Sequence, residues 1–292
     1  MKYFLIILLS MKVLIASVNI QTSYTTIAEI AKTIGGDKVE VNALANPHYD
    51  PHFIVPKPSL IAKLRRADLL IINGAGLEIG WMPSLLKSAN NGKIRSGSSG
   101  FLDISHAVNL INQPTNVSRA FGDVHAQGNP HYILDPHLVV NIADAIAQRL
   151  SRIDPKNATT YTQNLEHFSK QWNVYLTHLD AKMAKCTDKK VIQYHQLFNY
   201  YLGAYGYDNY GTIEPLPGIT PSSKHTIDLI NTINTQKIKR ILQDVYHEQK
   251  TAAFIAGKTE AKVIILPHDV GAVDEADTLE NFYNVIAQRL CQ

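Results

Sequence analysis

Three of the twelve histidines in this 292-residue chain share a sequence context. His52 follows a strand-like segment, His195 follows another directly, and His131 lies in a turn rich in glycine and proline. Neutral imidazole is the usual nitrogen ligand of Zn²⁺, which takes four ligands in a tetrahedron. Three imidazoles that converge in the fold would therefore hold a zinc ion.

A tetrahedral site needs a fourth ligand, and Asp269 is the candidate. It follows the last strand-like segment, and its carboxylate would lower the net charge of the site. The neighbouring His268 is a rival, because successive residues leaving a strand point in opposite directions. The sequence leaves the choice open and favours Asp269.

The elements that must position these residues are short apolar runs that alternate with amphipathic stretches. This alternation is typical of βαβ units and a mostly parallel sheet, in which ligands bind beyond the carboxyl ends of the strands. His52 and His195 fall at two such ends, one in each half of the chain. We expect strands at 12–17, 38–44, 68–73, 101–104, 190–194, 240–245 and 262–266, and helices at 25–34, 58–66, 79–87, 137–150, 197–205, 227–235, 248–255 and 278–290.

The middle of the chain predicts one long helix. Asp154 and Pro155 form a helix start, with Asp as the cap and Pro at the first helical position. Apolar residues then recur every three or four positions as far as Met183. About 30 residues at ~1.5 Å each span roughly 45 Å, enough to connect two lobes. The predicted fold is α/β, with two lobes that each have a mostly parallel sheet flanked by helices, joined by this helix.

We therefore divide the chain into a short signal segment at 1–11, an N-terminal lobe at 12–153, the connecting helix at 154–185 and a C-terminal lobe at 186–292. Lys2 and the apolar run 3–9 resemble an export signal. We expect the mature protein to be exported and soluble, because no apolar run reaches the length of a membrane-spanning helix. Its lysines and arginines form no broad stripe, which argues against nucleic-acid binding.

The remaining histidines and the cysteines carry weaker signals. His48 is interpreted as solvent-facing or as a neighbour of the ligands, because Pro51 separates it from His52. Asp123 and His125 lie in the polar segment 113–129 and could capture metal transiently, although we favour no role for them. Six others are interpreted as structural or exposed: His106, His137, His167, His178, His225 and His247. Cys186 and Cys291 either form one disulfide or remain two thiols.

Five short motifs make the chain similar to the zinc- and manganese-binding solute-binding proteins of bacterial ABC importers, over residues 12–290. Their order and spacing are more specific than any one of them. The motifs are Ile34-Gly35-Gly36-Asp37, Asp50-Pro51-His52 with Pro58-Ser59, Gly128-Asn129-Pro130-His131-Tyr132 with Leu134-Asp135-Pro136, Tyr194-His195 with Tyr200-Tyr201, and Glu214-Pro215-Leu216-Pro217-Gly218-Ile219 with Pro221-Ser222. The long predicted helix is also similar to the single backbone helix of that family.

The resemblance implies a periplasmic, monomeric receptor that binds one metal ion between its lobes and delivers it to the permease of an ABC importer. It implies ligands at His52, His131 and His195, with a carboxylate at or near Asp269. Zn²⁺ is the implied cargo and Mn²⁺ is less well suited, since three imidazoles favour zinc. The segment around Asp269 matches the family pattern least.

Three alternatives remain at this stage. Three histidines with an open fourth position could make a catalytic zinc in a hydrolase, with Glu214 as the base. The same fold could serve as a receptor for Mn²⁺ or Fe²⁺. It could also act as a surface adhesin without transport.

Overall fold

The computed structural model describes residues 17–114 and 125–291, and within them eight strands form two separate four-stranded sheets. Each sheet is parallel throughout, with strand order β2-β1-β3-β4 in the first and β6-β5-β7-β8 in the second. The strands are β1 Val18–Thr22, β2 Val39–Ala43, β3 Leu69–Ile72, β4 Phe101–Asp103, β5 Lys190–Gln193, β6 Asp208–Thr212, β7 Arg240–Gln243 and β8 Lys262–Ile265.

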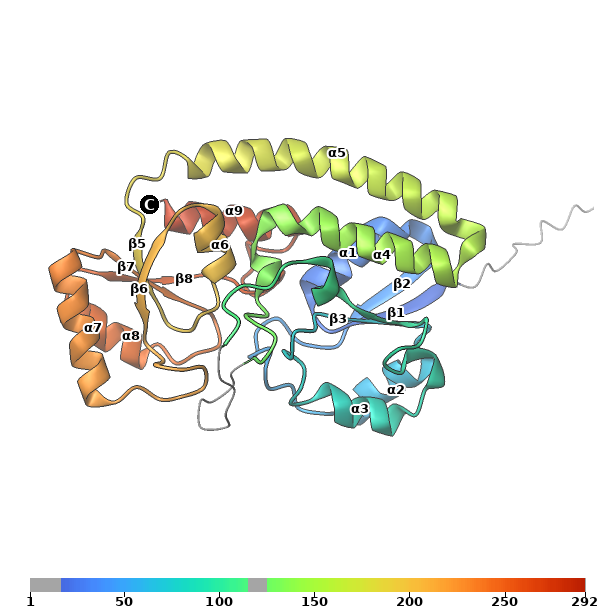
Figure 1. Ribbon diagram of the computed structural model, residues 1–292, viewed down its shortest axis with the longest axis horizontal. Helices are drawn as coiled ribbons and strands as arrows, with labels where there is room; N and C mark the ends of the chain where they lie inside the picture. The colour runs from blue at the N-terminus through green and yellow to red at the C-terminus, as the bar shows by residue number, and fades with distance from the viewer. Residues whose placement is uncertain (1–16, 115–124, 292) are drawn as a thin grey trace, which may run out of the picture.

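Helices flank both sheets. Each sheet with its helices forms one lobe, and the two lobes lie side by side (Figure 1). This confirms the predicted α/β fold. The helices are α1 Thr25–Gly35, α2 Pro58–Arg66, α3 Met82–Ala89, α4 Val139–Ile153, α5 Ala158–Met183, α6 Asn199–Ala204, α7 Ser223–Gln236, α8 Lys250–Ala256 and α9 Leu279–Leu290.

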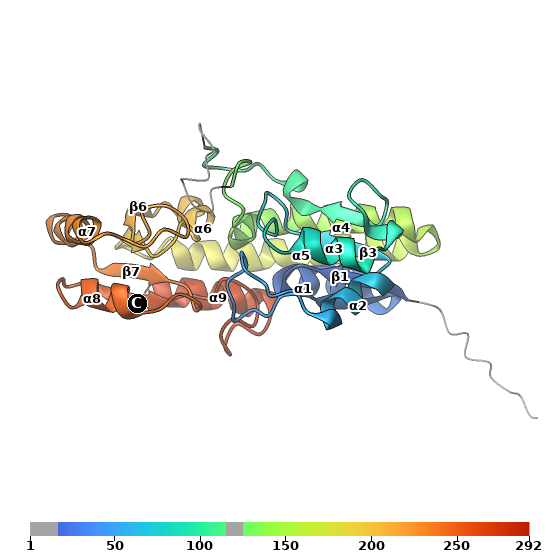
Figure 2. The same ribbon diagram turned by 90° about the horizontal axis from the view of Figure 1, so that it is seen from below.

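Helix α5 is the long helix that the sequence predicts, and it runs past both lobes (Figures 1 and 2). Its buried stripe packs against α1 and α4 of the first lobe and against α9. The stripe consists of Tyr161, Phe168, Trp172, Leu179 and Met183. The helix start differs from the expectation: a 3-10 turn at Pro155–Asn157 precedes it. The Asp154 carboxylate accepts hydrogen bonds from the side chains of Asn157 and Tyr161 and does not cap the backbone.

Two strands differ from the sequence-based expectation. The strand expected at 12–17 lies outside the described residues apart from Ser17, and β1 begins at Val18. Asn19 and Gln21 interrupt the apolar pattern of β1, so the more apolar segment before it gave the stronger signal. Strand β6 was not predicted, because this edge strand has the largely polar sequence DNYGT. The signal segment expected at 1–11 also lies outside the described residues.

The two ends of the second half are joined covalently. Cys186 and Cys291 form a disulfide, with 5.1 Å between their Cα atoms, so the disulfide alternative is the correct one. The bond ties the loop after α5 to the residue after α9. Among the described residues, no helix is both long and apolar enough to cross a membrane.

Candidate metal centre

His52 lies in the loop between β2 and α2 and is held by Asp50. The Asp50 Oδ1 atom accepts one hydrogen bond from the His52 backbone N–H at 2.9 Å and contacts His52 Nδ1 at 2.7 Å. Burial raises the pKa of the Asp50 carboxyl, but its hydrogen bonds with His52 outweigh this and hold the pKa below its usual value. A carboxylate on Nδ1 leaves Nε2 as the ligand atom. His52 Nε2 is buried and has no hydrogen-bond partner.

His195 follows β5 at its carboxyl end, as predicted. The fully buried Gln193 fixes the turn, since its Oε1 accepts a hydrogen bond from Phe198 N–H at 2.8 Å. His195 Nδ1 lies 2.9 Å from Glu214 Oε2, so a second carboxylate orients this imidazole. Nε2 again faces away from its carboxylate, toward the other histidines.

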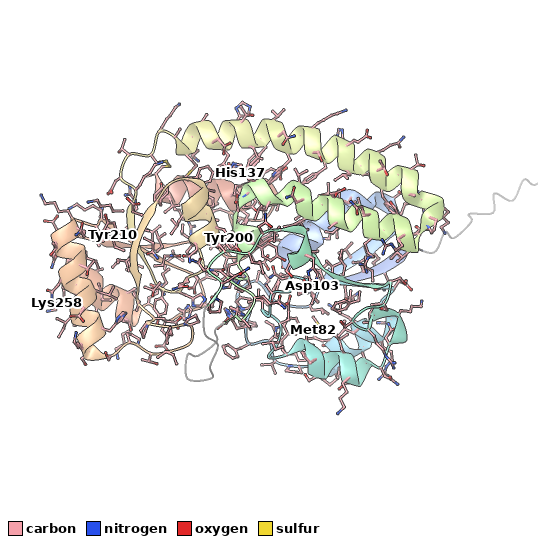
Figure 3. The ribbon with its side chains drawn as sticks, viewed as in Figure 1. Met82, Asp103, His137, Tyr200, Tyr210 and Lys258 are labelled. Atoms are coloured by element: carbon pink, nitrogen blue, oxygen red, sulfur yellow. A yellow bond between two sulfur atoms is a disulfide. The ribbon has the colours of Figure 1, made fainter. Side chains whose placement is uncertain are left out.

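His131 lies in the loop before α4, where the two lobes meet. Asn129 Oδ1 accepts a hydrogen bond from His131 N–H at 2.9 Å, and Asn129 Nδ2 donates to Gln196 O at 2.7 Å. The hydroxyl of Tyr200, labelled in Figure 3, donates to Asn129 O at 2.8 Å. Hydrogen bonds with two residues of the second lobe therefore fix the position of this loop of the first lobe.

These three histidines form one cluster in which a ligand atom of each lies within 4.8 Å of the others, and all three are buried. The Nε2 atoms of His131 and His195 are 3.3 Å apart. Two nitrogens bound tetrahedrally to zinc at ~2.0–2.1 Å would lie about 3.3 Å apart. The ring centroids are separated by 5.3 Å for His52 and His131, and by 5.4 Å for each of them and His195. This spacing suits a zinc ion at the centre.

The electrostatics of the cluster favour the form of imidazole that binds metal. Burial, followed by the neighbouring His52 and His195, lowers the pKa of His131 well below its usual value. Burial also lowers the pKa of His195, although its hydrogen bond with Glu214 opposes this. Both side chains are therefore neutral at physiological pH, and a metal ion need not displace protons from them.

Asp269 is buried, but its oxygens are occupied elsewhere. Oδ1 accepts hydrogen bonds from Thr26 N–H at 2.7 Å and from the Thr26 hydroxyl, and Oδ2 accepts one from Thr25 N–H at 3.0 Å. Asp269 thus caps the N-terminus of α1 across the lobe boundary. Among the described residues it is not part of the three-histidine cluster. Its rival His268 is also outside the cluster and packs against Tyr246, with ring centroids 4.9 Å apart.

Two further histidines lie beside the cluster: His125, for which the sequence left transient metal capture open without favouring it, and His247, which was interpreted as structural or exposed. The His125 ring stacks on His52, with 5.3 Å between centroids. His247 lies behind Glu214, its Nε2 3.3 Å from Glu214 Oε1 and its Nδ1 2.7 Å from Asp244 Oδ2. The only sequence signal for His247 was its place after strand β7, at another carboxyl strand end. His48 is exposed.

Glu214 is poorly placed to serve as the base of a hydrolase. Its two oxygens contact His195 and His247, one each. Burial raises the pKa of this carboxyl, but hydrogen bonds with His195 and His247 outweigh the burial and lower it to about 2. A carboxylate with so low a pKa is a weak proton acceptor, whereas a general base works best near the ambient pH. Glu214 positions imidazoles.

Two parallel sheets, a helix that runs past both and a buried histidine cluster where the lobes meet define a two-lobe α/β protein with a candidate metal centre. The chain belongs to the ZnuA family, described as zinc-uptake complex component A, periplasmic, whose sequence profile matches residues 20–292. This confirms the family resemblance seen in the sequence.

Curated relatives in this family carry names for more than one metal. The chain is 30% identical to the metal ABC transporter substrate-binding lipoprotein FimA of Streptococcus parasanguinis over 197 residues, 64% of this chain and 59% of that protein. It is 23% identical to the zinc-binding lipoprotein AdcA of Streptococcus pneumoniae over 281 residues, 93% of this chain and 54% of that protein. The manganese ABC transporter substrate-binding lipoprotein PsaA of Streptococcus pneumoniae is 30% identical over 64% of this chain and 59% of its own length. The chain thus spans little more than half the length of these relatives.

Solved structures agree with the fold. A deletion mutant of ZnuA with zinc bound superposes with a TM-score of 0.79 at 25% identity, covering 94% of this chain and 97% of the other. A mutant of a manganese-bound periplasmic metal-binding protein from Candidatus Liberibacter asiaticus gives a TM-score of 0.78 at 20% identity, with 94% and 98% covered.

Proposed function

We propose that this protein is the metal-binding receptor of an ABC importer and that its cargo is Zn²⁺, held by His52, His131 and His195. The observation that carries the proposal is the convergence of these three buried imidazoles, from loops of both lobes, at the spacing of a tetrahedral zinc site. Membership of the ZnuA family supports it. The fourth ligand expected from the sequence, Asp269, remains a prediction.

Zinc is favoured over manganese by the chemistry of the ligands. Imidazole nitrogens suit Zn²⁺, whereas Mn²⁺ prefers oxygen ligands such as carboxylates and water. The carboxylates nearest the cluster, Asp50 and Glu214, are each engaged with an imidazole Nδ1. An Mn²⁺ receptor of the same fold is the alternative, since the relative PsaA is named for manganese.

Delivery to a permease follows from the receptor function. We propose that the protein acts outside the cytoplasmic membrane as a soluble monomer, with lobes at residues 12–153 and 186–292 and the connecting segment 154–185. Metal held between two lobes is released when a docked partner changes their relative position by a small amount.

Elemental analysis of the purified full-length protein tests the proposal. The wild type, loaded with Zn²⁺ and dialysed, should retain about one zinc per chain, and His195→Ala should retain far less. His178→Ala is the matched control, because His178 is exposed on α5. A wild-type protein that cannot be loaded with zinc, or a His195→Ala variant that keeps its zinc, would refute the proposal.

A further inference from the structure

The cluster of three imidazoles leaves one tetrahedral position to be filled. Of the two histidines beside it, His247 has both ring nitrogens engaged with carboxylates, whereas His125 does not. The centroid of the His125 ring is 5.3 Å from that of His52, with 24° between the ring planes, and 6.2 Å from that of His131, with an interplanar angle of 89°. Tetrahedral imidazoles around zinc have centroids about 5 Å apart. His125 therefore lies near the position of a fourth ring.

One ring nitrogen of His125 is buried and forms no hydrogen bond. Its Nε2 atom is buried and has no hydrogen-bond partner, like Nε2 of His52. The ring also forms a hydrogen bond with the backbone of Gly76, and since Nε2 has no partner this bond belongs to Nδ1. A buried nitrogen without a partner is costly unless something binds it.

The backbone near His125 also connects this residue to the ligand loop. His125 O accepts a hydrogen bond from Gly128 N–H at 3.1 Å, and the next residue, Asn129, binds the His131 backbone. Gly128 is buried with a φ of +123°, a conformation that favours glycine. This turn keeps the His125 ring close to that of His131.

We infer, on the basis of the proposed function, that His125 rather than Asp269 supplies the fourth zinc ligand. Asp269 would have to release the N-terminus of α1 in order to bind metal, whereas His125 Nε2 has no other partner. His125 is not among the three residues whose ligand atoms all lie within 4.8 Å of one another. Binding zinc therefore requires the His125 ring to move closer to the other three, a movement that rotation about side-chain torsions can provide. A site of four nitrogens favours zinc over manganese.

X-ray absorption spectroscopy of the zinc-loaded full-length protein tests this inference, because it counts imidazole ligands. The wild type, Asp269→Asn and the control His178→Ala should each give four imidazoles, and His125→Ala should give three. The zinc affinity of His125→Ala, measured by competition with a chelator, should fall about tenfold or more.

The same experiment distinguishes a failure of the His125 assignment from a failure of the proposed receptor function. Three imidazoles in the wild type, with no change in His125→Ala, would overturn the assignment of His125 while leaving the receptor function intact. Wild-type protein that holds no zinc would instead refute the proposed function. A lower zinc affinity in Asp269→Asn together with an unchanged affinity in His125→Ala would return the fourth position to Asp269.

Discussion

Two carboxylates contact the Nδ1 atoms of two of the proposed ligands, Asp50 that of His52 and Glu214 that of His195. Such contacts fix the tautomer and make the opposite nitrogen a better ligand. We expect Glu214→Gln to lower zinc affinity about 10- to 100-fold, because the amide has no negative charge and orients the ring less firmly. Competition titration with a chelator measures this, with Glu260→Gln as the control because Glu260 is exposed. An affinity equal to that of the wild type would contradict the role given to Glu214.

His247 lies on the far side of Glu214 from His195 and contacts both Glu214 and Asp244. These two contacts lead us to expect that stability depends on pH. Burial lowers the pKa of His247, but hydrogen bonds with Asp244 and Glu214 outweigh it and raise the pKa to about 9. A histidine whose folded pKa lies above its unfolded value of about 6.5 stabilises the fold fully below pH ~6.5 and loses that effect as the pH rises through ~9.

We therefore expect His247→Gln to lower the free energy of unfolding of the metal-free protein by about 1–3 kcal/mol at pH 6. At pH 9.5 the wild type and the variant should differ much less. Chemical denaturation at the two pH values measures the difference, and an effect that does not depend on pH would show that His247 acts through packing alone.

At the scale of elements, helix α1 depends on a residue far away in the sequence. Tyr24, at its N-cap, offers no side-chain cap, and Asp269 instead binds the N–H groups of Thr25 and Thr26. In the metal-free protein, Asp269→Ala should lower the free energy of unfolding by about 2–3 kcal/mol, because two backbone donors lose a charged acceptor. Thermal denaturation measures this loss, with Asp274→Ala as the exposed control. A variant as stable as the wild type would mean that water replaces the carboxylate.

The elements also indicate what could be predicted from sequence. Helices such as α1 and α2 have a strong apolar period and clear ends, so their ranges were predicted to within a residue. Strand β6 was missed because an edge strand need not be apolar. The proposed ligand His195 could be placed at a strand end because it follows β5 directly, whereas His52 lies further along the loop after β2 than the sequence predicted. The positions of Asp269 and His125 depend on contacts between distant segments, which local patterns do not encode.

At the scale of the whole molecule, direct contacts between the two lobes hold them together. Asp269 of the second lobe binds α1 of the first, and Asn129 binds Gln196 across the same boundary. Helix α5 packs along the first lobe and against α9. These contacts favour small adjustments at the metal centre over a wide hinge opening.

Hydrogen exchange with and without zinc tests this view of the whole molecule. Zinc at 100 times its dissociation constant stabilises the fold by about 2.7 kcal/mol if it binds only the folded state. Removing zinc with a chelator should therefore speed local exchange at residues 50–54, 129–134 and 194–198, which carry the three ligands. We expect the exchange rates of α5 amides to change only as much as the global stability changes, because α5 packs on α1, α4 and α9 and not on the histidine cluster. Fast exchange along α5 in the metal-free protein would mean that the lobes separate, and release would then proceed by a hinge opening instead.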